Sequence, residues 1–371
     1  MASPLLRELA EATGAPCVSL YVPLEAGFEQ GRRNATRFGH AVDAAMARLQ
    51  DGATREDWRA RLTSIDPNDF PLHDVRTLAI FLGPTLLRTA AVTLPLPERA
   101  AVGHGFVLRP LALALDFARA YQLLALSVNH VAFFEGDQRG LRPHPLAGLP
   151  ASMADALGTE LTENQLQVHP AATGGGEIVF HGHGAAKDER SLDLERFHRV
   201  VQRALTDALK ASHVPLVLAA DQSHQGSLRA GLHLHQLLPI GLTGSPDHLS
   251  AEELHARAWP LIEDVVARER RDAAEAFETA RNHGKATDRL DETVRAAVVG
   301  RVRRLWVVAE AQAPGRIDAE AGRITVDGAG EDDDALEELA AIVLRHAGEV
   351  IVASEATPMP VNAEVAAQLR Y

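Results

Sequence analysis

The chain has 371 residues, of which 46% are hydrophobic, and a formal net charge of −13. This length exceeds one typical domain core, and we expect three domains. Because no apolar run approaches the ~18 residues that span a bilayer and the first residues do not resemble a signal peptide, we expect a cytoplasmic protein without a membrane partner. The acidic balance argues against a protein that coats nucleic acid through bulk charge, but it permits local RNA contacts.

The chain contains a single cysteine, Cys17. It excludes an internal disulfide framework and a zinc site built from cysteines. Cys17 lies in the apolar stretch CVSLYVPL, which predicts a buried strand closed by Pro23. We therefore expect an inert core thiol.

Residues 1–112 are predicted to form an N-terminal α/β domain. Short helical patterns cover residues 3–14 and 31–49, and the apolar runs 77–84 and 88–95 predict two strands joined by a Gly-Pro turn. The second helix carries Arg32, Arg33 and Arg37 near its start. They could contact phosphate, but an ordinary surface helix is the simpler interpretation.

Residues 113–240 are predicted to form the middle domain. The segment 121–137 predicts two strands around the polar pair Asn129-His130, displaying a sheet edge, and residues 150–172 are a connector by default. The fully apolar run in 214–222 predicts a strand that is covered on both faces of its sheet. Turn-forming residues at 239–247 predict a linker to the last domain.

Residues 249–371 are predicted to form a C-terminal α/β/α sandwich. Ser250 and Glu253 have capping-box spacing, and helical pattern continues in patches to about Arg281. Two apolar strands, 304–310 and 348–355, flank an acidic loop and a further helix. Most of the acidity of the chain lies in this last third.

The most distinctive stretch, 174–203, joins a glycine-rich loop to an amphipathic helix and reads GGGEIVFHGHGAAKDERSLDLERFHRVVQR. Glycines let a backbone approach a partner closely. Ser191 is the expected N-cap, and the apolar positions from Leu194 to Leu209 predict one buried face. The opposite face carries Glu195, Arg196, Arg199 and Arg203, for which a solvated surface is the simplest interpretation.

Several segments together resemble the third bacterial family of the archaeo-eukaryotic class-1 release factor and Pelota superfamily. They are LALSVNHVAFFEGD, FHGHGAAKDE with the helix that follows, PLVLAAD, LSAEELHARAW, AAVVGRVRRLWV and AQLRY. The resemblance covers nearly the whole chain. It implies a middle domain of ribonuclease H-like topology and a C-terminal domain like the kink-turn-binding ribosomal proteins.

The resemblance also implies a translation-associated function at the ribosomal A site. In release factors of this superfamily, a Gly-Gly-Gln loop of the middle domain positions water against peptidyl-tRNA, and the C-terminal domain commonly docks a translational GTPase. Here the nearest equivalent is Gly175-Gly176-Glu177, whose ionised carboxylate accepts hydrogen bonds but donates none. We therefore expect ribosome binding, with ribosomal RNA and peptidyl-tRNA as contacts, without a cofactor and without Gly-Gly-Gln ester hydrolysis. The expected contact residues are Gly174, Gly175, Gly176, Glu177, His181, Gly182, His183, Gly184, Lys187 and Arg196.

Two other classes of function stay open at this point. A metal-dependent hydrolase or nuclease would use His181, His183 and Asp188, with a further ligand from His169, His198, His233 or His235. A non-catalytic scaffold would bind a protein partner through the acidic C-terminal domain.

Serine chemistry with Ser223 or Ser227, His224 and Asp221 is disfavoured because Gly-x-Ser-x-Gly spacing is missing. His233 and His235 are expected to begin or line a helix, as core or surface residues.

Overall fold

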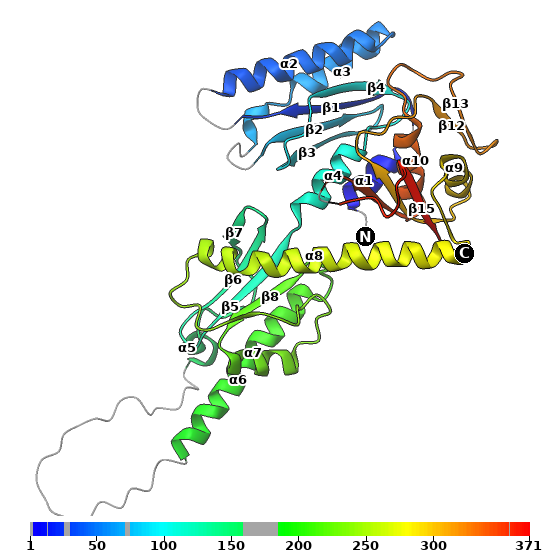
Figure 1. Ribbon diagram of the computed structural model, residues 1–371. Coiled ribbons are helices and arrows are strands. Elements are labelled where there is room, and N and C mark those ends of the chain that lie inside the picture. Colours follow the sequence, from blue (N-terminus) through cyan, green and yellow to red (C-terminus); the bar gives the residue numbers. More distant parts are fainter. Residues whose placement is uncertain (1–2, 13, 26–29, 71–74, 159–184, 356) are drawn as a thin grey trace, which may run out of the picture. The chain divides into compact units, whose positions relative to one another are not determined.

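The computed structural model describes residues 3–12, 14–25, 30–70, 75–158, 185–355 and 357–371, with the side chains of residue 30 and of 185–190 left out. Contacts divide the chain into two compact units, Met1–Ala118 with Glu269–Tyr371, and Arg119–Arg268 (Figure 1). We describe each unit by itself. The three domains inferred from the sequence stay a prediction.

The first unit begins with a four-stranded antiparallel sheet in the order β3-β2-β1-β4. Its elements are α1 (Pro4–Glu11), β1 (Cys17–Pro23), α2 (Gln30–Arg48), α3 (Gly52–Thr63), the 3-10 turn η1 (Pro67–Asp69), β2 (Thr77–Leu82), β3 (Leu87–Val92) and β4 (Arg99–Gly103). The predicted helices and strands of this region are confirmed, whereas α3 and β4 were not predicted.

The second part of this unit is a mixed sheet with the order β10-β15-β11-β14. Its elements are α4 (Arg109–Ala118), β10 (Ala286–Thr287), α9 (Leu290–Val298), β11 (Val302–Val308), the hairpin β12 (Arg316–Asp318) and β13 (Arg323–Thr325), α10 (Ala335–Arg345), β14 (Glu349–Ala353) and β15 (Val365–Leu369). Apolar residues of α9 and α10 pack on one face of the sheet, and Phe277 of α8 (Ala251–Asn282) packs against Trp306 on the other. Helices therefore cover both faces, as expected for an α/β/α arrangement.

The two parts of this unit share one hydrophobic core. One face of the N-terminal sheet packs against α2 and α3, where Met46, Trp58 and Leu62 are buried. The other face contributes Tyr21 and Phe81 to a cluster that also contains much of α10. The two ends of the chain thus stabilise each other through buried apolar surface.

The second unit contains a five-stranded sheet in the order β7-β6-β5-β8-β9. Its elements are β5 (Tyr121–Leu126), β6 (Val131–Asp137), β7 (Gly140–Pro143), α5 (Met153–Leu157), α6 (Ala185–Leu209), β8 (Leu216–Ala220), α7 (Gln222–Gly231), β9 (Leu242–Thr243) and the start of α8. Strands β5, β6 and β7 pair antiparallel, while β8 pairs parallel with β5 and β9. Apolar clusters lie on both faces of β8, so its predicted double coverage is confirmed. The ribonuclease H-like assignment stays a prediction.

Four local expectations for this unit need correction. Helix α6 begins at Ala185, so Ser191 lies inside it rather than at its N-cap. Strand β7 pairs with β6 on the side away from β5, so β6 is not an edge strand of the sheet. The expected linker 239–247 contributes β9 to the sheet. The segment with His233 and His235 follows the end of α7 instead of beginning a helix.

The start of α8 agrees with the sequence. Ser250 N–H donates to Glu253 Oε2 over 2.9 Å, and Glu253 N–H donates to Ser250 Oγ over 3.2 Å, which is the predicted capping box. The helix then runs unbroken past Pro260 to Asn282 instead of in patches.

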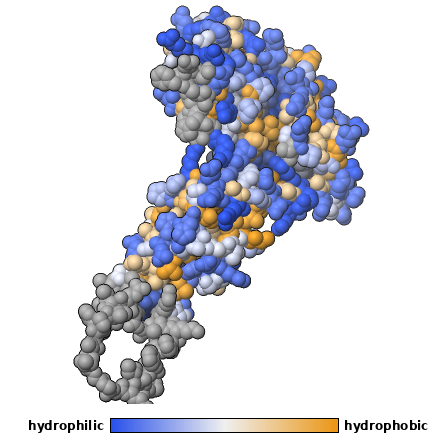
Figure 2. Space-filling model, turned by 60° about the vertical axis from the view of Figure 1, so that its left-hand side comes forward, coloured by the Kyte–Doolittle hydropathy of each residue, from blue (hydrophilic) through white to orange (hydrophobic). Residues whose placement is uncertain are grey.

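The surface mixes polar and apolar residues. On the face in Figure 2, hydrophilic residues are interspersed with small groups of apolar ones. The large apolar side chains exposed in the described part of the chain are Phe117, Leu192, Ile240, Val299, Val326 and Tyr371. None of the helices in that part is both long and apolar enough to cross a membrane.

Candidate functional site

Most of the predicted contact residues lie outside the described residues. These are Gly174, Gly175, Gly176, Glu177, His181, Gly182, His183 and Gly184, and the side chains of Lys187 and Asp188 are likewise not described. The backbone of Lys187 and Asp188 belongs to the first turn of α6. Arg196 is the one member of the predicted contact set whose side chain the structure describes.

Arg196 belongs to a row of exposed arginines on α6, together with Arg199 and Arg203. Spacings of three and four residues place side chains on one face of a helix. Arg196 Nη1 lies 3.7 Å from Asp193 Oδ1, and Arg199 Nη2 lies 3.8 Å from Glu195 Oε2. The Arg199–Glu195 pair is exposed and holds its guanidinium only weakly, whereas the Asp193 carboxylate beside Arg196 is buried. Arg199 and Arg203 are therefore the members of this row that can turn most readily towards an anionic partner.

The opposite side of α6 carries a buried histidine pair. His198 Nε2 and His224 Nδ1 of α7 are 2.8 Å apart, and both side chains are buried. Burial, together with the neighbouring His224, lowers the pKa of His198 from 6.5 to about 4. Burial also lowers the pKa of His224, although the Asp221 charge acts in the opposite direction. Both rings are therefore neutral at pH 7, and one donates a hydrogen bond to the other.

This pair bears on both catalytic alternatives. His198 already binds another imidazole, and His235 is paired with His213 at a nitrogen–nitrogen distance of 2.8 Å. Ser223 and Ser227 are exposed while His224 is buried, and no hydrogen bond joins them in the described structure. Within the described ranges, no group of three His, Cys, Asp or Glu side chains is arranged to hold a metal. The side chains of the proposed metal ligands His181, His183 and Asp188 are not among those that the structure describes.

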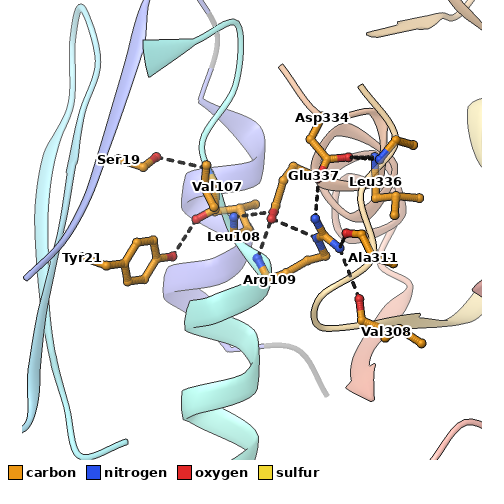
Figure 3. A network of polar contacts seen from close by, with 11 residues as sticks. Ser19, Tyr21, Val107, Leu108, Arg109, Val308, Ala311, Asp334, Leu336 and Glu337 are labelled. Atoms are coloured by element: carbon orange, nitrogen blue, oxygen red, sulfur yellow. Dashed lines mark hydrogen bonds and ion pairs between the residues drawn. The ribbon is translucent and has the colours of Figure 1, made fainter. Parts of the chain in front are cut away.

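A buried ionic network in the first unit was missed by sequence reasoning (Figure 3). Arg109, at the start of α4, is 3% exposed. Its Nε donates to Glu337 Oε1 over 2.9 Å and its Nη2 donates to Asp334 Oδ2 over 2.5 Å. Its Nη1 donates to the carbonyl oxygens of Ala311 (2.7 Å) and Val308 (3.3 Å). One side chain thereby joins α4 to three segments of the C-terminal part.

The carboxylates of this network also bind backbone amides. Glu337 Oε2 accepts hydrogen bonds from the N–H groups of Leu108 (2.7 Å) and Arg109 (3.0 Å). Nearby, the Tyr21 hydroxyl donates to the Val107 carbonyl oxygen over 2.6 Å. Burial, followed by the Glu337 charge, raises the pKa of Tyr21 well above its ordinary value. The available signal in the sequence was an arginine before proline inside the apolar run FVLRPLALAL.

The acidic segment 331–338 makes a second set of contacts with the N-terminal sheet. Asp332 Oδ2 accepts from Val102 N–H over 3.0 Å, and Asp333 Oδ1 accepts from His104 N–H over 2.8 Å. Burial acts to raise the pKa of Asp333, but hydrogen bonds from His104 and Gly330 outweigh it and lower that pKa. A cavity of about 240 Å³ lies beside these residues. Because the carboxylates beside this cavity already accept hydrogen bonds from the protein, we interpret the region as a structural contact between the acidic segment and the N-terminal sheet.

Part of the chain matches a known protein family. The model of bacterial archaeo-eukaryotic release factor family 3 matches residues 120–301. Over these residues, just under half of the chain, the protein is similar to this family. The resemblance inferred from the sequence is confirmed, and the release factor family 3 match spans the 174–190 segment, α6 and the histidine pair. A comparison with functionally curated proteins gave no match.

Solved structures with low sequence identity resemble the chain more widely. The archaeal translation termination factor aRF1 is 15% identical, with 99% of this chain and 96% of that chain covered and a TM-score of 0.26. An archaeal Pelota, in a model of its ribosome-bound form with ABCE1, is 15% identical over 79% of this chain and 78% of that chain, with a TM-score of 0.44. Dom34 of S. cerevisiae is 11% identical over 87% of this chain and 77% of that chain, with a TM-score of 0.36.

Proposed function

We propose that this chain is a translation-associated, release-factor-like protein that binds the ribosomal A site. The observation that carries the proposal is the match of residues 120–301 to the release factor family 3 model. The segment 174–190 and the first turns of α6 lie within that match, and we assign the ribosome contact to them. The proposed role is one of ribosome rescue, of a termination-like step or of ribosome occupancy.

The charge distribution of α6 supports this assignment. Because the whole chain carries −13, attraction to RNA has to come from local groups. Arg196, Arg199 and Arg203 supply exposed guanidinium groups on one helix face directly after the 174–190 segment. Arginine binds phosphate through a planar fork of donors, which suits a contact with ribosomal RNA.

The residue types in the loop argue against ester hydrolysis. The superfamily loop that acts on peptidyl-tRNA ends in glutamine, whereas Gly175-Gly176 is followed here by Glu177. An ionised carboxylate cannot donate a hydrogen bond. We therefore propose binding without peptidyl-tRNA hydrolysis, and we retain a translational GTPase as a proposed partner of residues 249–371.

Co-sedimentation of the full chain with 70S ribosomes over a salt series tests the proposal. We expect saturable binding that both His181→Ala/His183→Ala and Arg196→Ala/Arg199→Ala weaken. Each phosphate contact that is lost lowers the slope of log K against log salt by roughly 0.7–0.9. The matched control is Arg257→Ala/Arg268→Ala, which removes two exposed arginines of α8 in the same unit.

The outcomes separate the candidate functions. Absence of saturable binding at low salt, or equal weakening by the control, would exclude the proposed contact. Stoichiometric metal binding, together with an absence of ribosome binding, would instead favour the metal-dependent hydrolase. Release of peptide from peptidyl-tRNA on ribosomes would contradict the assignment of a purely binding role.

A further inference from the structure

One end of the C-terminal sheet gathers exposed positive charge. The starts of β10 and β11 lie beside the end of β15, because β15 runs antiparallel to both. Leu369 N–H donates to the Lys285 carbonyl oxygen, and Arg370 N–H donates to the Arg301 carbonyl oxygen, both over 2.8 Å. In Figure 1 this end of the chain lies beside the end of α8. We call Lys285, Arg301, Arg303, Arg370 and Tyr371 the basic sheet end.

A β-bulge presents one of these arginines to solvent. The pairing of β11 with β15 shifts register between Val302 and Arg304, so Arg303 is the extra residue of the bulge. Arg303 is exposed, while Val302 is buried. A bulge redirects a side chain and costs the strand part of its regular pairing, so it is commonly found where that direction is used.

Three of the four cations of the basic sheet end also differ in pairing from several nearby arginines. In this part of the chain Arg281, Arg289, Arg295 and Arg304 each form an ion pair with a carboxylate. Within the described structure, no Asp or Glu side chain lies within ion-pair distance of Lys285, Arg303 or Arg370, whereas Arg301 contacts the terminal main-chain oxygen of Tyr371. Lys285, Arg303 and Arg370 therefore have no acidic side chain beside them, although they belong to the most acidic third of the sequence.

An aromatic ring lies among these charges. Tyr371 is 65% exposed. The Arg301 guanidinium carbon lies 5.2 Å from the ring centroid, and Arg301 Nη2 donates to the terminal main-chain oxygen of Tyr371 over 2.6 Å. Arg370 holds the same strand end by donating to the carbonyl oxygens of Val302 (3.3 Å) and His346. The ring is thus fixed at the surface instead of buried in a core.

We propose that the basic sheet end binds single-stranded RNA. An exposed aromatic ring offers a stacking surface for an unpaired base, and the surrounding cations can follow the phosphates. The guanidinium against the ring adds cation–π attraction to such a stack. An acidic peptide would use the charges but not the open ring, so the ring favours RNA. The site extends beyond the A-site contact, since it uses residues of the other unit.

Fluorescence anisotropy with the full chain and a labelled oligouridylate of about 12 nucleotides tests this site. We expect Tyr371→Ala to weaken binding by roughly 5- to 150-fold, the equivalent of one stacked base. We expect Lys285→Ala/Arg303→Ala to lower the salt slope by about 1.4, since two phosphate contacts on a single strand are lost. The control Lys210→Ala/Arg323→Ala removes one exposed lysine and one exposed arginine elsewhere.

Four results would overturn the proposal. They are unchanged affinity in Tyr371→Ala, equal weakening by the control, equal affinity for an RNA duplex of the same length, or binding of polyglutamate in place of RNA. The Arg196→Ala/Arg199→Ala variant separates this site from the A-site contact. It should weaken 70S co-sedimentation while the oligouridylate affinity stays unchanged.

Discussion

Substitution of Arg109 by methionine provides a direct test of the buried network. The change removes the donors to Glu337, Asp334 and two carbonyl oxygens, while the two carboxylates stay in their buried positions. Loss of one partner from a buried ion pair costs about 3–5 kcal/mol. Since a typical domain is stable by about 5–15 kcal/mol, we expect Arg109→Met to remove a large part of the free energy of unfolding of this unit.

Urea unfolding followed by tryptophan fluorescence measures the effect. Trp58 and Trp306 are buried in this unit, and a Trp259→Phe background removes the signal of the other unit. Glu337→Gln still accepts hydrogen bonds from Leu108 and Arg109 N–H, so Arg109→Met/Glu337→Gln should recover part of the loss. The control Arg59→Met breaks an exposed pair with Asp43 and should cost less than about 1 kcal/mol. A loss in Arg109→Met no larger than in this control would refute the reasoning.

Two further predictions concern the second unit. As the pH drops from 6.5 to about 4, the imidazoles of the unfolded chain take up protons while the folded His198–His224 pair stays neutral. Protonation therefore favours the unfolded chain, and the free energy of unfolding should fall by up to about 2 kcal/mol once partial solvent access is allowed for. Chemical unfolding over this range should show a flatter profile for His198→Gln, but not for the exposed-site control His248→Gln; an unchanged profile would contradict the assignment. Gly241→Ala would place a Cβ 2.4 Å from the Leu218 carbonyl oxygen and should destabilise the unit by about 1–3 kcal/mol. Gly226→Ala in α7 meets no atom within 4 Å and should stabilise by about 0.5–1 kcal/mol in the same chemical unfolding assay, so equal effects would count against this packing.

Local sequence patterns predicted the elements whose signal is local. Apolar runs located β1, β2, β5, β6, β8, β11 and β14, because each strand is buried on at least one face. Cys17 is buried in β1, where burial raises its pKa to about 11, as expected for an inert thiol. The capping box at Ser250 and Glu253 was equally visible, since its two residues lie three positions apart.

Features that depend on distant residues were not predictable in this way. Arg109 and Glu337 lie 228 positions apart, and neither residue alone indicates that the other neutralises it. Strand β9 has only two residues and belongs to the sheet because β8 pairs with it. Likewise, the sequence suggested His198 only as a candidate metal ligand and His224 only as a member of a disfavoured serine site, and only the packing of α6 on α7 shows that the two side chains contact each other. The loop residues of the predicted contact set remain predictions.

The shared core of the first unit has a consequence for synthesis of the protein. Residues 119–268 are contiguous and can fold as soon as they leave the ribosome, but the first unit needs both ends of the chain. At about 5–20 residues per second, the interval between residue 118 and the last strand is on the order of 10–50 seconds. During that time the face of the N-terminal sheet with Tyr21 and Phe81 has no α10 to cover it. The nascent chain therefore exposes apolar surface for chaperones to bind until the C-terminal residues emerge.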